Sequence, residues 1–258
     1  MNVTETIARI LKTEGVEWMA CFPSNPIIEA VAKEGIRPIS FRHERGAVMA
    51  ADGFSRMSDR NRFGVVAVQD QAGAENAMGG ISQAFADNVP ILVLPRGSGL
   101  DRTAVRPYFS AAKTYQSIAK HVEMIARPDM VGDVMRRAFH ALRNGRPGPV
   151  VVEMPADVCE QEVPDGSVPY YSPKISIQIP STSDIKDAVR VLIRANKPVI
   201  WSGMGVLLSN ATAELREFAE LTEIPVYTTM PGKSSIDERH PLALGGGSSA
   251  TTLAARQW

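Results

Sequence analysis

The sequence predicts an α/β fold in which an open parallel sheet with helices on both faces is followed by an incomplete second α/β domain of Rossmann-like type. Short β-branched runs alternate with segments whose apolar residues recur at helical spacing, which is typical of parallel sheets covered by helices. A stretch rich in proline and serine interrupts this alternation, which then resumes. We therefore predict a domain at residues 1–165, a linker at 166–183 and a partial domain at 184–258.

The first domain is expected to begin with a helix at residues 4–14. Ile7, Ile10 and Leu11 follow Val3 at helical spacing, and Gly15 stands where a helix commonly ends. Short apolar runs that read as parallel strands follow, with a segment long enough for a helix between successive runs. They lie at residues 16–21, 39–41, 65–68, 91–94 and 150–152.

The second domain has fewer elements than a complete sheet requires. Its pattern predicts helices at residues 184–195 and 211–221 and strands at 199–202 and 225–228. Two strands do not complete a sheet, and the chain ends in an amphipathic segment with an exposed Trp258 and no helix-stop signal. We expect this end to be a truncation or a surface completed by another chain.

Composition excludes several classes of partner. The 28 basic and 28 acidic residues are mixed along the chain, so we expect neither nucleic-acid nor membrane binding. Two cysteines and four scattered histidines lack metal-ligand spacing, so no metal site is predicted. Because the start has no signal-peptide pattern and no run reaches the roughly 18 apolar residues of a membrane span, we expect a cytoplasmic protein.

The most informative residue is Glu44. It directly follows a predicted strand and opens a predicted helix, at the carboxyl edge of a parallel sheet where ligands bind in open α/β folds. Ala47, Ala50 and Ala51 line the helix at spacings of three and four, and such small residues let another backbone approach. On position alone, Glu44 could instead simply complement the positive end of the helix dipole.

A resemblance to a known family decides between these interpretations. Arg42-His43-Glu44 is followed after six residues by Ala51-Asp52-Gly53, then by Phe54 and Arg56. This segment resembles the pyrimidine-binding domain of thiamine-diphosphate enzymes of the acetolactate-synthase and benzoylformate-decarboxylase type. The resemblance implies that Glu44 is catalytic: it would bind the ring nitrogen of the aminopyrimidine and favour the imino tautomer that removes the thiazolium C2 proton.

A second candidate segment is the strand-turn-helix at residues 65–76. Such a turn is suited to hold a ligand against backbone groups, and the resemblance places it beside the pyrimidine ring. Ala72, Gly73 and Asn76 are therefore expected to contact the cofactor, and Gln71 the substrate. Relatives commonly have Ser or Thr followed by Ser-Gly-Pro-Gly here, whereas this chain has bulkier residues at 69–73, which weakens substrate assignment by analogy. The alternative is that Asp70 and Gln71 cap the helix.

A third segment, Phe22-Pro23-Ser24-Asn25-Pro26, matches a loop that in relatives covers the active centre of the neighbouring subunit. By that resemblance Pro23 would contact the cofactor, and Ser24 or Asn25 the substrate. An ordinary proline-rich turn between strand and helix is the alternative.

A fourth segment, Gly203-Met204-Gly205, stands at a strand-to-helix turn. Leu208 replaces the third glycine of a dinucleotide fingerprint, so FAD, which some relatives carry in this central domain, is possible but not indicated. A nicotinamide oxidoreductase is a remote alternative, because Tyr227-Thr228-Thr229 stands where an acidic ribose ligand is expected.

The resemblance also predicts a missing part. Relatives hold the diphosphate through Mg²⁺ at a Gly-Asp-Gly segment, and the nearest matches, Ala51-Asp52-Gly53 and Pro164-Asp165-Gly166, lie in the Glu44 helix and at the start of the linker. We expect the cofactor to be thiamine diphosphate, with its Mg²⁺ held by a domain that is absent from this chain. The chain alone would then be inactive. The expected activity is decarboxylation or carboligation of a 2-oxo acid, in a homodimer or homotetramer or with a complementary subunit. The alternative is a short subunit of a split enzyme or a non-catalytic binding module.

Overall fold

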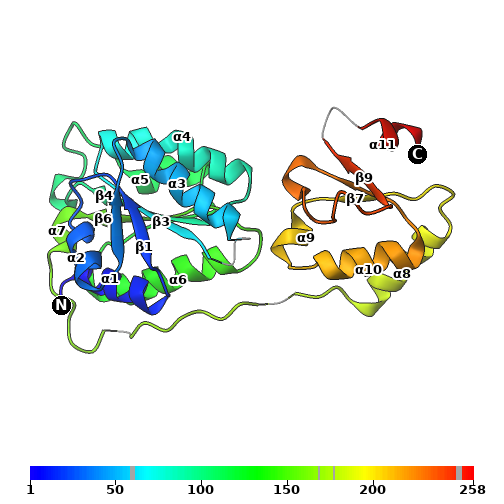
Figure 1. Ribbon diagram of the computed structural model, residues 1–258. Coiled ribbons are helices and arrows are strands. Elements are labelled where there is room, and N and C mark those ends of the chain that lie inside the picture. Colours follow the sequence, from blue (N-terminus) through cyan, green and yellow to red (C-terminus); the bar gives the residue numbers. More distant parts are fainter. Residues whose placement is uncertain (59–61, 168, 177, 248–251) are drawn as a thin grey trace. The chain divides into compact units, whose positions relative to one another are not determined.

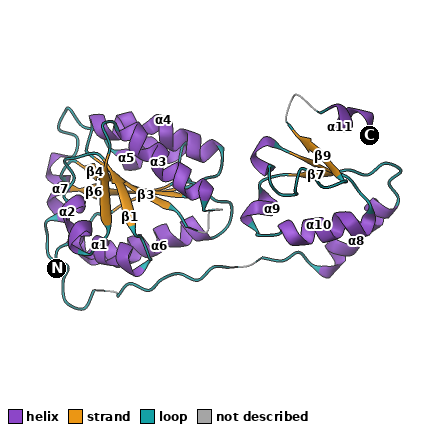
Figure 2. Ribbon diagram, in the orientation of Figure 1, coloured by secondary structure: helices purple, strands orange, loops and turns teal. Residues whose placement is uncertain are grey.

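The computed structural model describes residues 1–58, 62–167, 169–176, 178–247 and 252–258. The chain divides into two compact units, Met1–Ser176 and Ile177–Trp258. Each unit contains a parallel sheet with helices packed around it (Figures 1 and 2). The predicted α/β fold class is confirmed.

The first unit is built on a six-stranded parallel sheet in the order β2-β1-β3-β4-β6-β5. All residues of the central strand β3 are buried, as expected when both faces of a parallel sheet are covered. The strands are β1 (Trp18–Cys21), β2 (Arg37–Ser40), β3 (Gly64–Val68), β4 (Ile91–Gly97), β5 (His121–Met124) and β6 (Val150–Pro155).

Helices cover both faces of this sheet, and a separate apolar core lies under each layer (Figure 2). One layer contains α1 (Val3–Thr13), α2 (Ile27–Lys33) and α6 (Val131–Arg143). The other contains α3 (Glu44–Met57), α4 (Ala72–Ala86) and α5 (Ala111–Thr114). The remaining short helices are η1 (Leu100–Arg102), η2 (Tyr115–Ser117), η3 (Pro128–Met130) and α7 (Ala156–Cys159).

The first helix shows why the sequence pattern was informative. Asn2 Oδ1 accepts a hydrogen bond from the backbone N–H of Glu5, and the Glu5 carboxylate accepts one from the backbone N–H of Asn2. This reciprocal pair is a capping box. Ile7 and Leu11, one turn apart, are completely buried on the side that faces the core. The helix predicted at residues 4–14 is thus confirmed within one residue at each end.

Helices α3 and α4 pack closely beside each other, and glycine makes this possible. A Cβ atom on Gly80 would lie 2.8 Å from Cγ1 of Val48, closer than carbon atoms approach without displacement. The Ser55 hydroxyl is also buried between elements: it lies 2.6 Å from the Pro90 carbonyl oxygen and accepts a hydrogen bond of 2.8 Å from the Gly64 amide. These contacts fix α3 against α4 and the strands beneath them.

The second unit is smaller and has little core. Its three parallel strands lie in the order β7-β8-β9, and its buried apolar cluster centres on Ala219, Val226 and Ile236. No residue of α8 is buried within the described chain. The elements are α8 (Thr182–Ile193), β7 (Ile200–Ser202), α9 (Gly205–Leu208), α10 (Thr212–Thr222), β8 (Val226–Thr228), η4 (Met230–Gly232), β9 (Ala243–Gly246) and α11 (Leu253–Gln257).

The number of strands differs from the sequence-based expectation in both units. The second unit has a third strand, β9, with the sequence Ala-Leu-Gly-Gly, and the first has the additional edge strand β5, His-Val-Glu-Met. Neither contains a run of β-branched residues, and every residue in both is only partly buried. Pairing with a neighbouring strand, which a local pattern does not reveal, determines these two strands.

Part of the segment between the sheets is attached to the first unit. The Tyr170 hydroxyl donates a hydrogen bond to Glu14, and the Ser176 amide donates one of 2.6 Å to Asn144 Oδ1. At the other end of the second unit, Trp258 is half-exposed and its Nε1 donates to the Pro198 carbonyl at 3.1 Å.

Candidate functional site

The connections of the first sheet create a switch point between β1 and β3. From β1 the chain goes to β2 at the edge and then returns past β1 to β3, so the loops after β1 and β3 leave in opposite directions. Crevices of this kind, at the carboxyl ends of the strands, are where open α/β sheets bind ligands. The three candidate segments, at residues 22–26, 44 and 69–76, all follow strands at this edge.

Glu44 is a buried acidic residue at this edge. It is the first residue of α3 and is only 3% exposed. The preceding residue, His43, caps the helix, because its Nδ1 accepts a hydrogen bond of 3.2 Å from the Arg45 amide. The carboxylate is therefore held at a helix start, where the partial positive charge of the backbone stabilises it.

The two oxygens of Glu44 have different environments. Oε2 accepts a hydrogen bond of 3.2 Å from Asn76 Nδ2 in the first turn of α4. Oε1 faces Gly73, where an added Cβ atom would lie only 3.0 Å from it. In the described part of the chain, no hydrogen-bond donor contacts Oε1. This oxygen therefore has lone pairs free to accept a hydrogen bond from a ligand.

The turn before α4 has a strained backbone. Gln71 has φ 44° and ψ −108°, and its side chain makes no capping hydrogen bond. The proposed alternative role of Gln71 as a helix cap is therefore not seen. Positive φ at a residue other than glycine costs energy and is concentrated at functional sites. Ala72 and Asn76 are exposed beside this turn, while Gly73 is buried.

The loop after β1 is held in place by Asn25. Its side-chain Nδ2 donates to the carbonyl oxygens of Val68, at 2.9 Å, and Leu94, at 3.2 Å, and its Oδ1 accepts from the Ile27 amide at 3.2 Å. Asn25 is buried, and both N–H groups of its amide are engaged. This geometry favours a structural role for Asn25, whereas Pro23 and Ser24 are exposed.

The predicted site residues form two groups. Glu44, Gly73 and Asn76 lie together at the starts of α3 and α4. Pro23, Ser24 and Asn25 line a groove of about 690 Å³. The sequence analysis did not identify Arg96, which also lines this groove; its only local signal is a charged residue at the end of the apolar run that forms β4.

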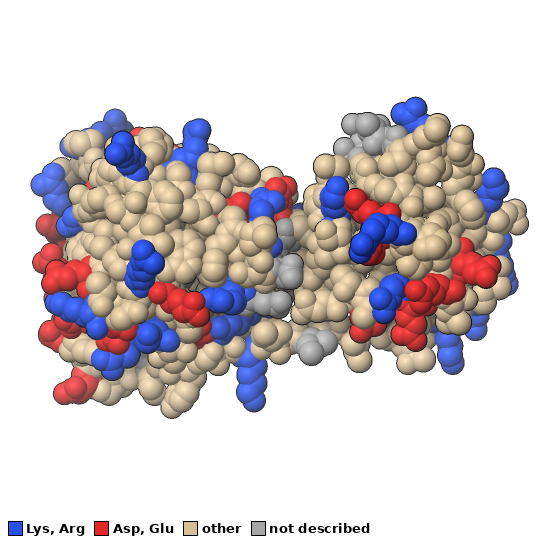
Figure 3. Space-filling view, viewed as in Figure 1, with Lys and Arg blue, Asp and Glu red and all other residues tan. Residues whose placement is uncertain are grey.

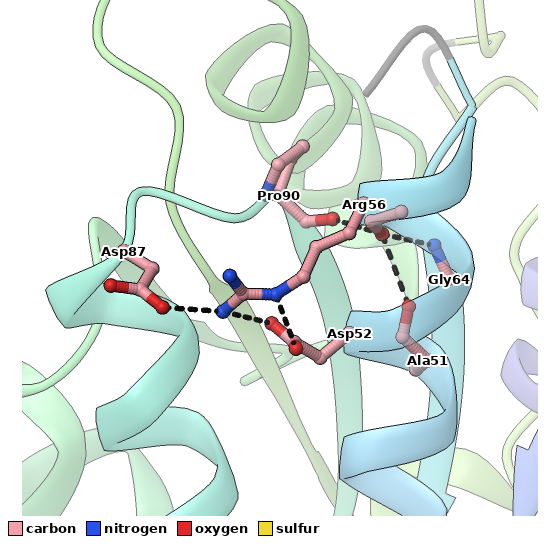
Figure 4. Close-up of polar contacts among 7 residues, drawn as sticks. Ala51, Asp52, Arg56, Gly64, Asp87 and Pro90 are labelled. Atoms are coloured by element: carbon pink, nitrogen blue, oxygen red, sulfur yellow. Dashed lines mark hydrogen bonds and ion pairs between the residues drawn. The ribbon is translucent and has the colours of Figure 1, made fainter. Parts of the chain in front are cut away.

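A charged network fixes the other end of α3 (Figure 4). Arg56 Nε donates to Asp52 at 2.8 Å, and Nη2 donates to Asp87, just after α4, at 2.7 Å. Burial alone would lower the pKa of Arg56, but its hydrogen bonds with Asp52 and Asp87 outweigh that effect and raise the pKa. Helices α3 and α4 are therefore linked at both ends, by Glu44 and Asn76 at their starts and by this network near their C-terminal ends.

The charges give little indication of other binding partners. Among the described residues, no group of three or more His, Cys, Asp and Glu side chains could hold a metal ion. Acidic and basic side chains are interspersed on the face of each unit seen in Figure 3. Within the described parts of the chain, no helix is both long and apolar enough to cross a membrane.

Two family models match the chain. One describes the N-terminal TPP-binding domain of thiamine pyrophosphate enzymes and matches residues 1–124, and the other describes their central domain and matches residues 185–258. The chain belongs to the thiamine pyrophosphate enzyme family. The N-terminal match includes all the predicted cofactor-site residues and Arg96, and the Gly203-Met204-Gly205 turn between β7 and α9 lies in the central-domain match.

Several named members of this family are similar along nearly the whole chain. A probable acetolactate synthase large subunit from Methanocaldococcus jannaschii is 34% identical over 259 residues, covering 95% of this chain and 43% of that protein. An Escherichia coli glyoxylate carboligase is 34% identical, covering 95% and 42%, and an Arthrospira platensis acetolactate synthase is 32% identical, covering 95% and 44%. The chain thus spans less than half the length of these relatives.

Proposed function

We propose that this chain supplies the pyrimidine-binding part of a thiamine-diphosphate-dependent enzyme that decarboxylates a 2-oxo acid, joins the product to an acceptor, or does both. The observation that carries this proposal is the buried residue Glu44, one of whose carboxylate oxygens is held by Asn76. The other lies beside Gly73 and has no donor within the described parts of the chain. The names of the relatives, acetolactate synthase and glyoxylate carboligase, support this class of reaction.

The residues present fit the aminopyrimidine of the cofactor. An added Cβ atom on Gly73 would lie 2.2 Å from Gln69 Cγ and 3.0 Å from Glu44 Oε1, so only glycine lets this turn pack against both side chains. A ring nitrogen of the aminopyrimidine would donate a hydrogen bond to Oε1. Glu44 would hold or share a proton at Oε1, and Asn76 would keep the carboxylate in place through Oε2. When bound, thiamine diphosphate supplies the carbon nucleophile that attacks the keto carbon and accepts the electrons released as carbon dioxide leaves.

The other predicted site residues complete this proposal. Pro23 and Ala72 would contact the cofactor, and Ser24 and Gln71 would face the substrate. We assign Asn25 the task of holding the loop that carries Pro23 and Ser24, because its amide is bonded to the strands below.

The diphosphate and its Mg²⁺ would be held by a part of the assembly outside this chain. That part would come from the remainder of a longer polypeptide, in a homodimer or homotetramer, or from a complementary subunit. Helices α3 and α4 are the surface we assign to this contact: Met49 on α3 is 46% exposed, and Asn76 is exposed on α4. The isolated chain would then be inactive.

The direct test is a Glu44→Gln variant of the complete assembly. Glutamine keeps the size and the contact with Asn76 but does not share a proton in the same way, so carbon dioxide release from 2-oxo acids should fall by at least about a hundredfold, the lower range for acid–base groups. Glu160→Gln, an exposed carboxylate after α7, is the matched control and should retain activity. Unchanged turnover in the Glu44→Gln enzyme would refute the proposal.

The mass of the protein made from its native gene tests how the assembly is formed. A mass about twice 27.9 kDa, as expected if a further domain of ordinary size and the rest of the central one follow, would mean that one polypeptide carries both parts of the site. A mass of 27.9 kDa would mean that a separate subunit brings the diphosphate part, which co-purification with this chain should then reveal.

A further inference from the structure

The groove beside the β1 loop contains a basic residue whose charge has no evident protein partner. Its floor is the carboxyl edge of the first sheet, and α2 forms one wall through Ile28, Glu29 and Ala32. The alternation of side chains along β4 places Arg96 on this face of the sheet. Leu92 and Leu94 point into the core under α1, α2 and α6, and Arg96, two residues further along the strand, lies on the same face.

Arg96 lacks the contacts that normally stabilise a partly buried guanidinium. Its Nε is buried and has no hydrogen-bond partner among the residues that the structure describes. Among the described residues, no carboxylate forms an ion pair with it. A buried donor left unsatisfied is destabilising, so a ligand that accepts a hydrogen bond from Arg96 would be stabilised in this groove.

The acidic residue of the groove does not neutralise Arg96. Glu29 forms an ion pair of 3.0 Å with Lys33 on its own helix, and its side chain is 78% exposed. The amide of Asn25 also lines the groove, but its N–H groups are bonded to the Val68 and Leu94 carbonyls. Two hydroxyls remain, those of Ser24 in the β1 loop and Ser40 at the end of β2. Ser24 has φ 87°, a left-handed conformation that is strained for serine. The groove therefore combines one positive charge, two hydroxyls and a strained loop.

We propose that this groove binds the carboxylate of a small organic acid through Arg96 and that, in the assembled enzyme, this acid is a 2-oxo acid substrate. The second part rests on the proposed function. A guanidinium presents parallel N–H donors that match the two oxygens of a carboxylate, and Ser24 and Ser40 offer hydroxyls to the oxo group. A volume of about 690 Å³ lies in the range of small-molecule sites.

Titration of the full 258-residue chain, without cofactor, tests this site directly. Because the Arg96 Nε–H is buried, its signal should be observable in ¹H–¹⁵N spectra, and Arg96→Lys identifies it by its loss. Pyruvate should shift this signal to saturation, whereas uncharged pyruvamide should not. Arg96→Gln should weaken pyruvate binding about tenfold or more, the usual size of a lost charged hydrogen-bonded pair. Arg102→Gln, an exposed arginine in η1, is the control and should bind normally.

The outcomes separate this inference from the proposed function. Equal pyruvate affinity in Arg96→Gln and the unmodified chain would overturn it, as would an Arg96 signal that does not move. Inorganic phosphate that binds as tightly as pyruvate would overturn the assignment of a carboxylate site. Glu44→Gln should bind pyruvate normally, since Glu44 does not line the groove, so a failure of the thiamine-diphosphate proposal would leave this titration unchanged. Arg96→Lys keeps the charge and provides a second variant if Arg96→Gln does not fold.

Discussion

The side-chain amide of Asn76 donates a hydrogen bond of 3.2 Å to the buried carboxylate of Glu44, which joins the first turn of α4 to the first residue of α3. The charged network of Arg56 joins the other ends of the same helices. Since the candidate cofactor site lies at only one end of this pair, the two linkages have separable roles: one holds the Glu44 carboxylate of the candidate site, and the other holds the two helices together.

Asn76→Ala should reveal the first linkage. Removal of the amide leaves Glu44 Oε2 without its donor in a buried position, so the free energy of unfolding should fall by about 1 kcal/mol. Urea denaturation of the 258-residue chain measures this change. Gln83→Ala, an exposed amide on the same helix, corrects for the better helix propensity of alanine. Equal changes in the two variants would show that the Asn76 contact contributes nothing to stability.

Arg56→Gln should be more destabilising than Asp87→Asn. The arginine variant leaves Asp52, whose side chain is 9% exposed, without its charged partner, and we expect a loss of about 1–2 kcal/mol in the free energy of unfolding. Asp87 is 40% exposed, so its substitution should cost less than about 1 kcal/mol. Arg9→Gln, which removes an exposed pair with Glu34, provides the baseline. The reverse order of the two effects would contradict this description of the network.

The parts of the fold predicted from sequence are those with strong local periodicity. The capped helix α1 and the β-branched strands β3 and β6 could be predicted because each has a local pattern of apolar residues that matches its burial in the structure. Strands β5 and β9 were not, because long-range pairing rather than local composition makes them strands.

The candidate site shows the same division. The position of Glu44 at a helix start could be predicted, because strand, turn and helix signals are adjacent in the sequence. The groups that surround it come from elsewhere in the chain, so the donor to Oε2 and the close approach of Gly73 needed the structure. Asn25 also needed it, since its partners Val68 and Leu94 are 43 and 69 residues away.

Ser24 and Asn25 are adjacent, yet their substitution should have opposite effects on stability. Asn25→Ala removes the partners of two carbonyl oxygens and one amide, and should lower the free energy of unfolding by about 2–4 kcal/mol. Ser24→Gly relieves a residue at φ 87° and should raise it by about 0.5–1 kcal/mol. Urea denaturation of both variants measures these changes. A loss of stability in Ser24→Gly would show that the serine hydroxyl stabilises the loop by more than the strain costs.

The buried thiol of Cys159 should make stability decrease in alkaline solution. Burial raises the pKa of Cys159 from 9.0 to about 11, although Thr4 and the charge of Arg96 partly oppose this shift. The unfolded chain therefore loses the proton at lower pH than the folded chain does. Its contribution to stability is fully present below pH 9 and is lost as the pH rises toward 11. Burial likewise raises the pKa of Tyr115 and of Tyr170, which adds further loss above about pH 10.

Cys159→Ala isolates the thiol from the tyrosines, which both proteins retain. Between pH 8 and pH 10 the unmodified chain should lose about 1 kcal/mol more of its unfolding free energy than the variant does, since one pKa unit corresponds to about 1.4 kcal/mol. Urea denaturation at the two pH values gives this difference directly, and any constant cost of removing the sulfur atom cancels from it. Parallel losses in the two proteins would mean that the thiol ionises as readily in the folded chain as in the unfolded one, and that its environment is accessible to water.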